Sequence, residues 1–167
     1  LFFPTGTQAN LAALMAHCGR GEEYLVGQMA HTYRLEGGGA AVLGSIQPQP
    51  LPNEPDGTIA LGAIANAIKP HDFHFAITRL LALENTFNGL PLPDAYLEAA
   101  TGLARSRGLA THLDGARLMN AAAASNRDAA WIAEQFDTVS LCLSKGLGAP
   151  IGSVLVGPKD LIETTRR

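Results

Sequence analysis

Residues 138–150 read Thr138-Val139-Ser140-Leu141-Cys142-Leu143-Ser144-Lys145-Gly146-Leu147-Gly148-Ala149-Pro150, a strand-like run that leads directly into a glycine-rich turn. A second strand-like run, residues 109–113, ends in Asp114-Gly115-Ala116-Arg117. Lys145 follows Asp114 by 31 residues (145 − 114), which leaves room for one helical crossover and a return strand. The spacing predicts two neighbouring parallel strands whose carboxyl ends bring Asp114 and Lys145 together.

Helical and strand-like runs alternate along the rest of the chain. We expect helices at residues 7–17, 30–36, 61–68, 93–107 and 128–135, and further strands at 23–26, 41–43, 80–84 and 151–156. Residues 47–57 are rich in proline and polar side chains and are expected to form a surface loop. This alternation predicts an α/β protein, a three-layer α/β/α arrangement in which helices flank a mostly parallel sheet.

The composition is that of a globular domain and excludes several classes of partner. The chain has 167 residues, of which 47% are hydrophobic and 16% charged. A net charge of −3 with scattered basic residues argues against nucleic acid, and no apolar run approaches the roughly 20 residues of a membrane helix. Cys18 and Cys142 lack metal-type spacing, so we expect no metal site and two reduced core thiols in a cytoplasmic protein.

The pair formed by Asp114 and Lys145 suggests a particular cofactor. Pyridoxal 5'-phosphate (PLP) needs a lysine amine for its Schiff base and a carboxylate that keeps its pyridinium nitrogen protonated. The plain structural alternatives are an aspartate that caps the next helix, with Arg117 solvated beside it, and a surface lysine in a glycine loop. The apolar flanks of Lys145 argue against the second alternative. A dinucleotide site is disfavoured because Gly146-x-Gly148 lacks the third glycine and precedes a strand.

Two further segments suit the same cofactor. Gly6 and Thr7 lie between a strand-like start and a helix, where the free N–H groups of a first helical turn attract a phosphate. A helix cap formed by Thr5 or Thr7 is the alternative explanation of this motif. His31 follows the strand expected at 23–26, and an imidazole there can stack on a flat ring and transfer protons. The alternative for His31 is an ordinary surface histidine.

Six motifs run in order along the chain: Pro4-Thr5-Gly6-Thr7-Gln8-Ala9-Asn10, Gly21-Glu22-Glu23-Tyr24, Gly37-Gly38-Gly39-Ala40, Leu83-Glu84-Asn85-Thr86, His112-Leu113-Asp114-Gly115-Ala116-Arg117 and Leu143-Ser144-Lys145-Gly146-Leu147-Gly148. Together they resemble the low-specificity L-threonine aldolases, which belong to the aromatic amino acid β-eliminating lyase group of fold-type I PLP enzymes. The resemblance covers essentially the whole chain. It implies that residues 1–167 form the central part of the PLP-binding large domain, with an N-terminal segment and a small C-terminal domain outside this chain.

The resemblance also implies a role for each matching residue. Lys145 matches the Schiff-base lysine, Asp114 the partner of the pyridine nitrogen, and His31 the histidine stacked on the ring. Gly6 and Thr7 match the phosphate-binding pair, Ser144 a further phosphate contact, and Arg117 the arginine beside the phenolic oxygen of the cofactor and the substrate carboxylate.

One position departs from the pattern of the family. Many relatives carry histidine after Glu-Asn-Thr, near the β-hydroxyl of the substrate, whereas this chain has Phe87. If Phe87 faces the pocket, an apolar wall replaces a hydrogen-bonding group and discrimination between threonine and allo-threonine weakens. The alternative is that Phe87 packs in the core.

The function implied by the resemblance is reversible cleavage of L-threonine or L-allo-threonine to glycine and an aldehyde. The expected partner is a small amino acid substrate, and the full-length protein is expected to form a homo-oligomer, namely a homotetramer. Two alternatives stay open. One is another fold-type I lyase that acts on a different amino acid, and the other is a catalytically incomplete chain that acts only in binding or assembly.

Overall fold

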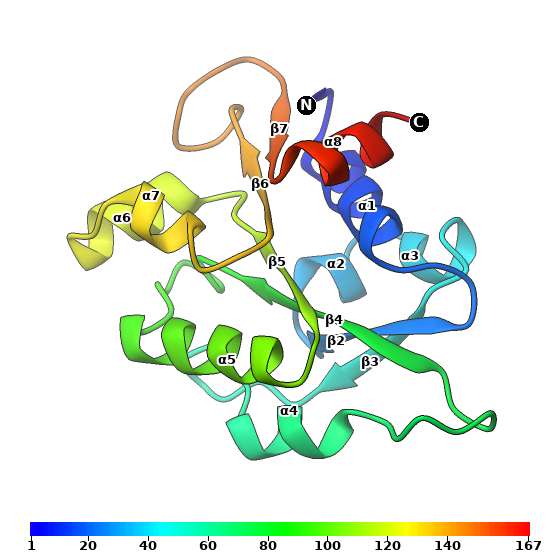
Figure 1. Ribbon diagram of the computed structural model, residues 1–167. Helices are drawn as coiled ribbons and strands as arrows, with labels where there is room; N and C mark the ends of the chain where they lie inside the picture. The colour runs from blue at the N-terminus through cyan, green and yellow to red at the C-terminus, as the bar shows by residue number, and fades with distance from the viewer.

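A seven-stranded sheet lies between two layers of helices in the computed structural model, which describes residues 1–167 (Figure 1). The strands are β1 (Phe2–Phe3), β2 (Glu22–Gly27), β3 (Gln47–Leu51), β4 (Ile77–Glu84), β5 (Ala110–Asp114), β6 (Thr138–Cys142) and β7 (Ser153–Val156). Their order in the sheet is β1-β7-β6-β5-β4-β2-β3, and β7 alone runs opposite to its neighbours. The expected mostly parallel α/β fold is confirmed.

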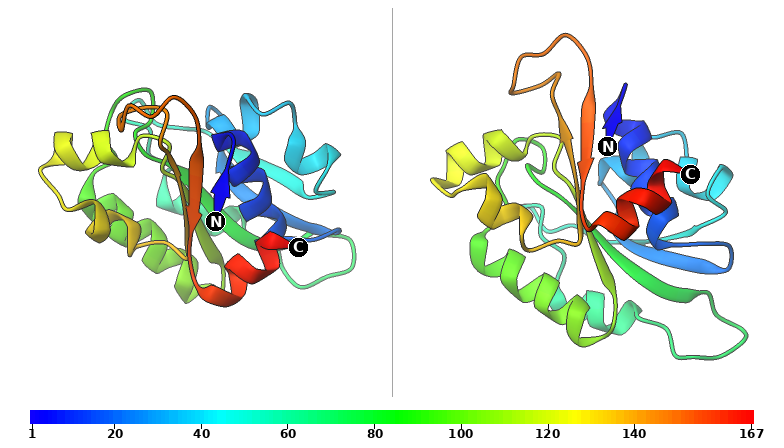
Figure 2. Two further views of the ribbon diagram at one scale, coloured as in Figure 1. Left: turned by 90° about the horizontal axis from the view of Figure 1, so that it is seen from above. Right: turned by 45° about the horizontal axis from the view of Figure 1, so that its top comes forward.

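Helices cover both faces of this sheet. They are α1 (Gly6–His17), α2 (His31–Arg34), α3 (Gly39–Val42), α4 (Leu61–Ala67), α5 (Asp94–Ser106), α6 (Leu118–Ser125), α7 (Ala129–Ala133) and α8 (Lys159–Arg166). One face carries α4 to α7, and the other carries α1, α2, α3 and α8 (Figures 1 and 2). None of these helices combines the length and the apolar character that crossing a membrane requires.

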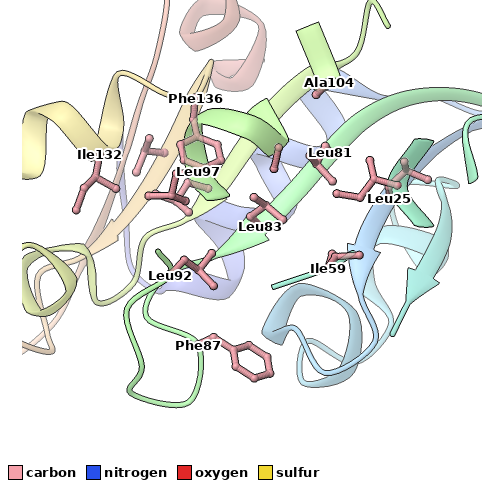
Figure 3. Packing of buried hydrophobic residues seen from close by; sticks show 14 of the residues in the cluster. Leu25, Ile59, Leu81, Leu83, Phe87, Leu92, Leu97, Ala104, Ile132 and Phe136 are labelled. Atoms are coloured by element: carbon pink, nitrogen blue, oxygen red, sulfur yellow. The ribbon is translucent and has the colours of Figure 1, made fainter. Parts of the chain in front are cut away.

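The two faces of the sheet bury two separate hydrophobic clusters. In β4, Leu81 and Leu83 belong to the larger cluster, under α5, whereas Leu80 and Ala82 belong to the smaller cluster, under α1. Figure 3 shows the larger cluster, with Leu81 and Leu83 close to Leu97 of α5. Because successive side chains of a strand point to opposite faces, a strand that is covered on both sides is apolar at nearly every position.

Two of the expected elements are wrong. Residues 41–43 were expected to form a strand, but 41 and 42 belong to α3 and residue 43 caps its end. Gly37 and Gly38 take φ values of 64° and 67°, which reverse the chain and start this helix, while Ala40 packs against the smaller cluster. The apolar residues Val42 and Leu43 are exposed and do not join the sheet.

The second correction concerns residues 47–57, which were expected to be a loop throughout. Residues 47–51 form β3, an edge strand parallel to β2. Pro48 and Pro50 occupy alternate positions, so the N–H groups that they lack fall on one side of the strand. An edge strand needs hydrogen bonds on only one side, and prolines on its outer side are therefore tolerated. The prolines made the segment resemble a loop, although an edge strand paired on one side only can contain them.

Candidate active site

A cavity of about 370 Å³ lies where β5 and β6 end and α1 begins. Six of the residues selected from the sequence line this cavity: Gly6, Thr7, His31, Asp114, Ser144 and Lys145. The carboxyl edge of a parallel sheet is where α/β proteins place their ligands, because loops and helix N-termini converge there. The structure thus brings together most of the residues that the sequence analysis selected.

Lys145 lies in the turn between β6 and β7, which projects at the top of Figure 1. The chain has three lysines. Lys69 pairs with the buried Glu23, and Lys159 lies 3.8 Å from Glu163. Lys145 has no acidic partner in the structure and lines the cavity. It is therefore the lysine whose amine is free to react with a bound group.

Asp114 is the last residue of β5, and its side chain is buried. Its Oδ1 accepts a hydrogen bond from the backbone N–H of Ala116 at 3.0 Å, and its Oδ2 accepts one from Asn10 Nδ2 at 2.8 Å. Each oxygen retains a lone pair for a further donor. The two bonds fix the orientation of the carboxylate at the cavity wall, which is what a group that must bind a ring N–H requires.

The first turn of α1 forms another wall of the cavity. Thr5 caps the helix, since its side chain accepts a hydrogen bond from the N–H of Gln8 at 3.2 Å. The backbone N–H groups of Gly6 and Thr7 have no partner within the chain. Helix cap and phosphate site are thus compatible here, because the cap uses one N–H group and leaves two for an anion.

Gly6 also has a steric role in this turn. A Cβ atom at this position would lie 2.8 Å from Cys142 Sγ and 3.6 Å from Ser153 Oγ. The helix can begin this close to β6 and β7 because residue 6 has no side chain. The approach places the N-terminus of α1 over the carboxyl ends of the strands.

Two carboxyl groups hold His31 at the cavity. Glu36 Oε1 lies 2.9 Å from His31 Nδ1, and Glu84 Oε2 accepts a hydrogen bond from the His31 backbone N–H at 2.8 Å. An ionised carboxylate only accepts hydrogen bonds, so His31 Nδ1 is the donor in its contact with ionised Glu36. Nε2 then carries the free lone pair of the imidazole. A tautomer of this kind can accept a proton from a bound hydroxyl.

Burial raises the pKa of both glutamates above the usual value for the residue. It raises the pKa of Glu84 to about 7, and the negative charge of Asp114 adds to that shift. Burial likewise raises the pKa of Glu36, against the hydrogen bonds from Asn10 and His31 that lower it. Ligand atoms of His31, Glu36 and Asp114 all lie within 4.8 Å of one another. The site therefore brings acidic side chains close together, and among them Glu84 has a pKa raised to about 7.

Sequence reasoning gave no role to Asn10, Glu36 or Glu84 individually. Asn10 and Glu84 occur inside quoted motifs, but an amide or a carboxylate on a helix or strand carries no chemical pattern of its own. Asn10 donates hydrogen bonds to both Asp114 and Glu36, over separations of 104 and 26 residues. Such long-range bonds depend on the packing of α1 against the sheet, so no local signal could have identified them.

Two selected residues do not line the cavity. Phe87, which was expected to face the pocket, instead packs in the larger hydrophobic cluster, with its ring against Gly57 and near Leu92 (Figure 3). The loop after β4 turns back through paired hydrogen bonds between Phe87 and Leu90, and this turn directs the ring into the core. Arg117 is exposed at the start of α6, one residue beyond the cavity-lining Ala116, and has no acidic partner.

A mostly parallel sheet with a polar cavity at its carboxyl edge defines an α/β protein with a ligand site at the strand ends. Comparison with known families narrows this class. The model of the family described as beta-eliminating lyase matches residues 1–167, and the chain belongs to this family. The resemblance of the six motifs is thereby confirmed.

Individual relatives agree with this placement. The chain is 56% identical over 167 residues to the low specificity L-threonine aldolase of Escherichia coli K12, covering 100% of this chain and 50% of that protein. It is 42% identical to the probable low-specificity L-threonine aldolase 2 of Arabidopsis thaliana, covering 99% and 48%. The solved Leishmania major threonine aldolase superposes with a TM-score of 0.85 at 27% identity, covering 99% and 51%. The chain spans about half the length of the relatives that it matches.

The donor set of the cavity fits PLP. An unpaired lysine can take the aldehyde, a buried and oriented carboxylate can take the ring N–H, and two free N–H groups on α1 can take a phosphate. Ser144 adds a hydroxyl beside Lys145. An imidazole lies at the same cavity to cover a flat ring. The aldehyde, the ring nitrogen, the phosphate and the flat ring of the cofactor thus each have a matching group.

Proposed function

We propose that the full-length protein is a PLP-dependent aldehyde-lyase that cleaves L-threonine and L-allo-threonine to glycine and acetaldehyde, and cleaves related β-hydroxy amino acids in the same way. The observation that carries this proposal is the convergence of an unpaired Lys145 and an oriented Asp114 on one cavity. Family membership and the threonine aldolases among the relatives support it. Residues 1–167 then form the central part of the cofactor-binding domain.

In this proposal Lys145 holds the cofactor covalently and Asp114 accepts the hydrogen bond of its ring nitrogen. Gly6, Thr7 and Ser144 bind the phosphate. When bound, the cofactor supplies an electron sink for the electron pair that remains on the substrate Cα after the Cα–Cβ bond is broken. Because Asp114 is buried and held by two donors, its carboxylate would stay oriented toward the ring nitrogen of a bound cofactor.

The cleavage also needs a group that accepts the proton of the β-hydroxyl. We assign this step to His31, because Glu36 occupies Nδ1 and leaves Nε2 free. Arg117 is exposed, lacks an acidic partner and lies beside the cavity, so its guanidinium is available to a substrate carboxylate. Phe87 stands in the core in this chain, and we give it no contact with substrate.

We also propose that the full-length protein is a homo-oligomer in the cytoplasm. Leu35, Val42 and Leu43 expose between 63% and 74% of their surface within a short segment around α3. Exposed apolar residues gathered in this way favour contact with another subunit. Cys18 and Cys142 are buried free thiols, as expected in a reducing compartment.

The activity is tested with the full-length protein loaded with PLP. L-threonine is expected to yield equal amounts of glycine and acetaldehyde, and Lys145→Ala is expected to abolish this yield. Lys159→Ala is the matched control, since Lys159 is exposed and does not line the cavity. If the wild type converts L-threonine to ammonia and a 2-oxo acid in place of glycine, then the activity is β-elimination of water from threonine and the aldolase proposal is wrong.

A further inference from the structure

The amide of Asn10 has no hydrogen-bonding capacity left for a ligand. Its Nδ2 donates to Asp114 Oδ2 at 2.8 Å and to Glu36 Oε1 at 2.9 Å. Its Oδ1 accepts from Ser140 Oγ at 2.6 Å and lies 3.2 Å from His112 Nε2. An asparagine amide has two donor hydrogens and two acceptor lone pairs, and all four are used. Asn10 therefore orients neighbouring side chains and has no free donor or acceptor with which to bind a ligand itself.

These contacts define the orientation of the amide. Two carboxylates lie on one side and can only be served by the NH₂ group, while the hydroxyl of Ser140 and the ring of His112 lie on the other. His112 Nε2 must then be a donor toward Asn10, so that Nδ1 of the same ring is an acceptor. Burial lowers the pKa of His112 to about 3, and the ring is neutral at physiological pH.

The same chain of donors continues away from the cavity. His112 Nδ1 lies 2.9 Å from Thr138 Oγ1, which lies 2.7 Å from His17 Nε2. Since His112 Nδ1 is an acceptor, the Thr138 hydroxyl donates to it and accepts from His17. Every donor thus points the same way, from His17 at the end of α1, along the face of the sheet that α1 covers, to Asp114. Bonds aligned in this manner polarise one another.

We propose that Asn10 is a positioning residue: by donating to Asp114 and Glu36 together, it fixes the carboxylate that binds the cofactor ring nitrogen and, through Glu36, the tautomer of His31. The inference rests on the proposed function, because it concerns how this site receives PLP. Asn10, Asp114 and Glu36 come from three separate segments, and the side chains of all three are nearly fully buried. A single amide therefore couples the carboxylate assigned to the ring nitrogen with the glutamate that orients His31.

The variant Asn10→Asp tests the donor role, because it keeps the shape of the side chain and replaces both N–H groups by an oxygen. A third carboxylate then faces Asp114 and Glu36. The other charged or titratable groups around them are Glu84, His31, Lys145, Tyr24 and His112, whose Nε2 lies 3.2 Å from the side chain of residue 10. The Kd of the apo full-length protein for PLP is expected to rise at least ten-fold at pH 8. Like charges so close together take up a proton as the pH falls, and a protonated acid is a donor again.

The ratio of the Asn10→Asp Kd to the wild-type Kd should therefore fall about ten-fold between pH 8 and pH 6, because a carboxyl group that takes up a proton can again donate a hydrogen bond. Asn10→Ala should raise Kd by a factor that does not depend on pH. Ser140→Ala is the matched control, because it leaves both N–H groups of Asn10 in place and should change Kd less than about three-fold. Wild-type affinity in Asn10→Asp, or a loss that is the same at both pH values, would overturn the proposal.

A second measurement needs neither a variant nor the cofactor. Nitrogen chemical shifts of His112 in the apo protein should show the Nε2–H tautomer from pH 5 to pH 9. A ring protonated at Nδ1 at any of these values would reverse the donor chain and contradict the proposal. The outcomes also separate the two proposals. Uptake of PLP without threonine cleavage would remove the aldolase activity alone, whereas unchanged PLP affinity in the Asn10 variants would remove the positioning role alone.

Discussion

Glu84 and Asp114 face each other as register partners at the carboxyl ends of the parallel strands β4 and β5. A buried and a partly buried carboxyl group on neighbouring strands do not both ionise freely. Asp114 receives hydrogen bonds at both oxygens, whereas Glu84 accepts one, from the backbone of His31. Partial burial, with the negative charge of Asp114 added to it, raises the pKa of Glu84 to about 7. Strand register therefore makes this site sensitive to pH.

Glu84→Gln should change how stability depends on pH. The folded-state pKa of Glu84 lies above its unfolded value of 4.5, so the folded protein holds a proton that the unfolded chain releases. Ionisation of the unfolded chain therefore lowers stability as pH rises from about 4.5 to about 7, and the loss is constant above that range. The free energy of unfolding falls by at most about 3 kcal/mol over this range, as the difference between the two pKa values implies.

The glutamine variant lacks this loss and can still accept the bond from His31. Its melting temperature at pH 8 should therefore exceed that of the wild-type apo protein, while the two should converge near pH 4. Thermal denaturation at both pH values measures the difference. A wild-type melting temperature that rises between pH 5 and pH 8 relative to Glu84→Gln would contradict the raised pKa.

Gly6→Ala should weaken both folding and PLP affinity. The added Cβ would meet Cys142 Sγ at 2.8 Å, and α1 must shift away from the strand ends to relieve that contact. The double variant with Cys142→Ala removes the obstructing sulfur and should recover part of the loss. A coupling free energy of about 1–2 kcal/mol between the two positions is expected for residues in contact. Additive effects in the stability measurement would show that the close approach is not the cause.

Phe87→His should lower stability and leave substrate preference unchanged. The ring is 7% exposed in a cluster with Leu92 and Ile59, so the substitution buries a polar imidazole and removes apolar contacts. A loss of about 2–4 kcal/mol is typical of such changes in a core. Phe73→His is the control, because Phe73 is 91% exposed. A shift in the ratio of kcat/KM for threonine and allo-threonine, at unchanged melting temperature, would restore Phe87 to the pocket.

Asp114→Asn should allow PLP to bind but lower its catalytic use. The amide keeps one acceptor oxygen, but its NH2 group must face the donor of either Asn10 or Ala116, so one of the two hydrogen bonds is lost together with the negative charge. A neutral group stabilises a protonated ring nitrogen poorly, and a loss of about 3 kcal/mol or more corresponds to roughly a 100-fold lower kcat. Steady-state kinetics on the PLP-loaded full-length variant gives this value. A kcat within a few-fold of wild type would remove Asp114 from its assigned role.

The sequence reveals those parts of the site that follow from local patterns. Lys145 and Asp114 each follow an apolar strand-like run, and parallel strands bring their carboxyl ends together, so their meeting could be predicted. Two elements could not be predicted. The strand β3 contains two prolines, which are typical of loops, and the apolar segment after three glycines forms the helix α3 where a strand was expected. The direction of a side chain in a loop is also set by distant packing, which is why Phe87 points into the core.

The polar contacts behind the site lay furthest from sequence reasoning. Asn10 reaches Asp114 across 104 residues, and His112 reaches Asn10 across 102. His112 lies two residues before Asp114 on the same face of β5, and its hydrogen-bond partners come from α1 and β6. Such bonds exist because the whole sheet is assembled, and they carry no signature in any single segment.

The claim that Lys145 is the covalent attachment point for PLP is tested most directly by borohydride reduction of the loaded full-length protein, followed by mass mapping of its peptides. The account predicts that the reduced cofactor is found on Lys145 alone, with Lys69 and Lys159 unmodified because both are paired with glutamates. It also predicts that the visible absorption band of the bound cofactor disappears on reduction. Modification of Lys69 or Lys159 in stoichiometric yield, with Lys145 unmodified, would contradict it.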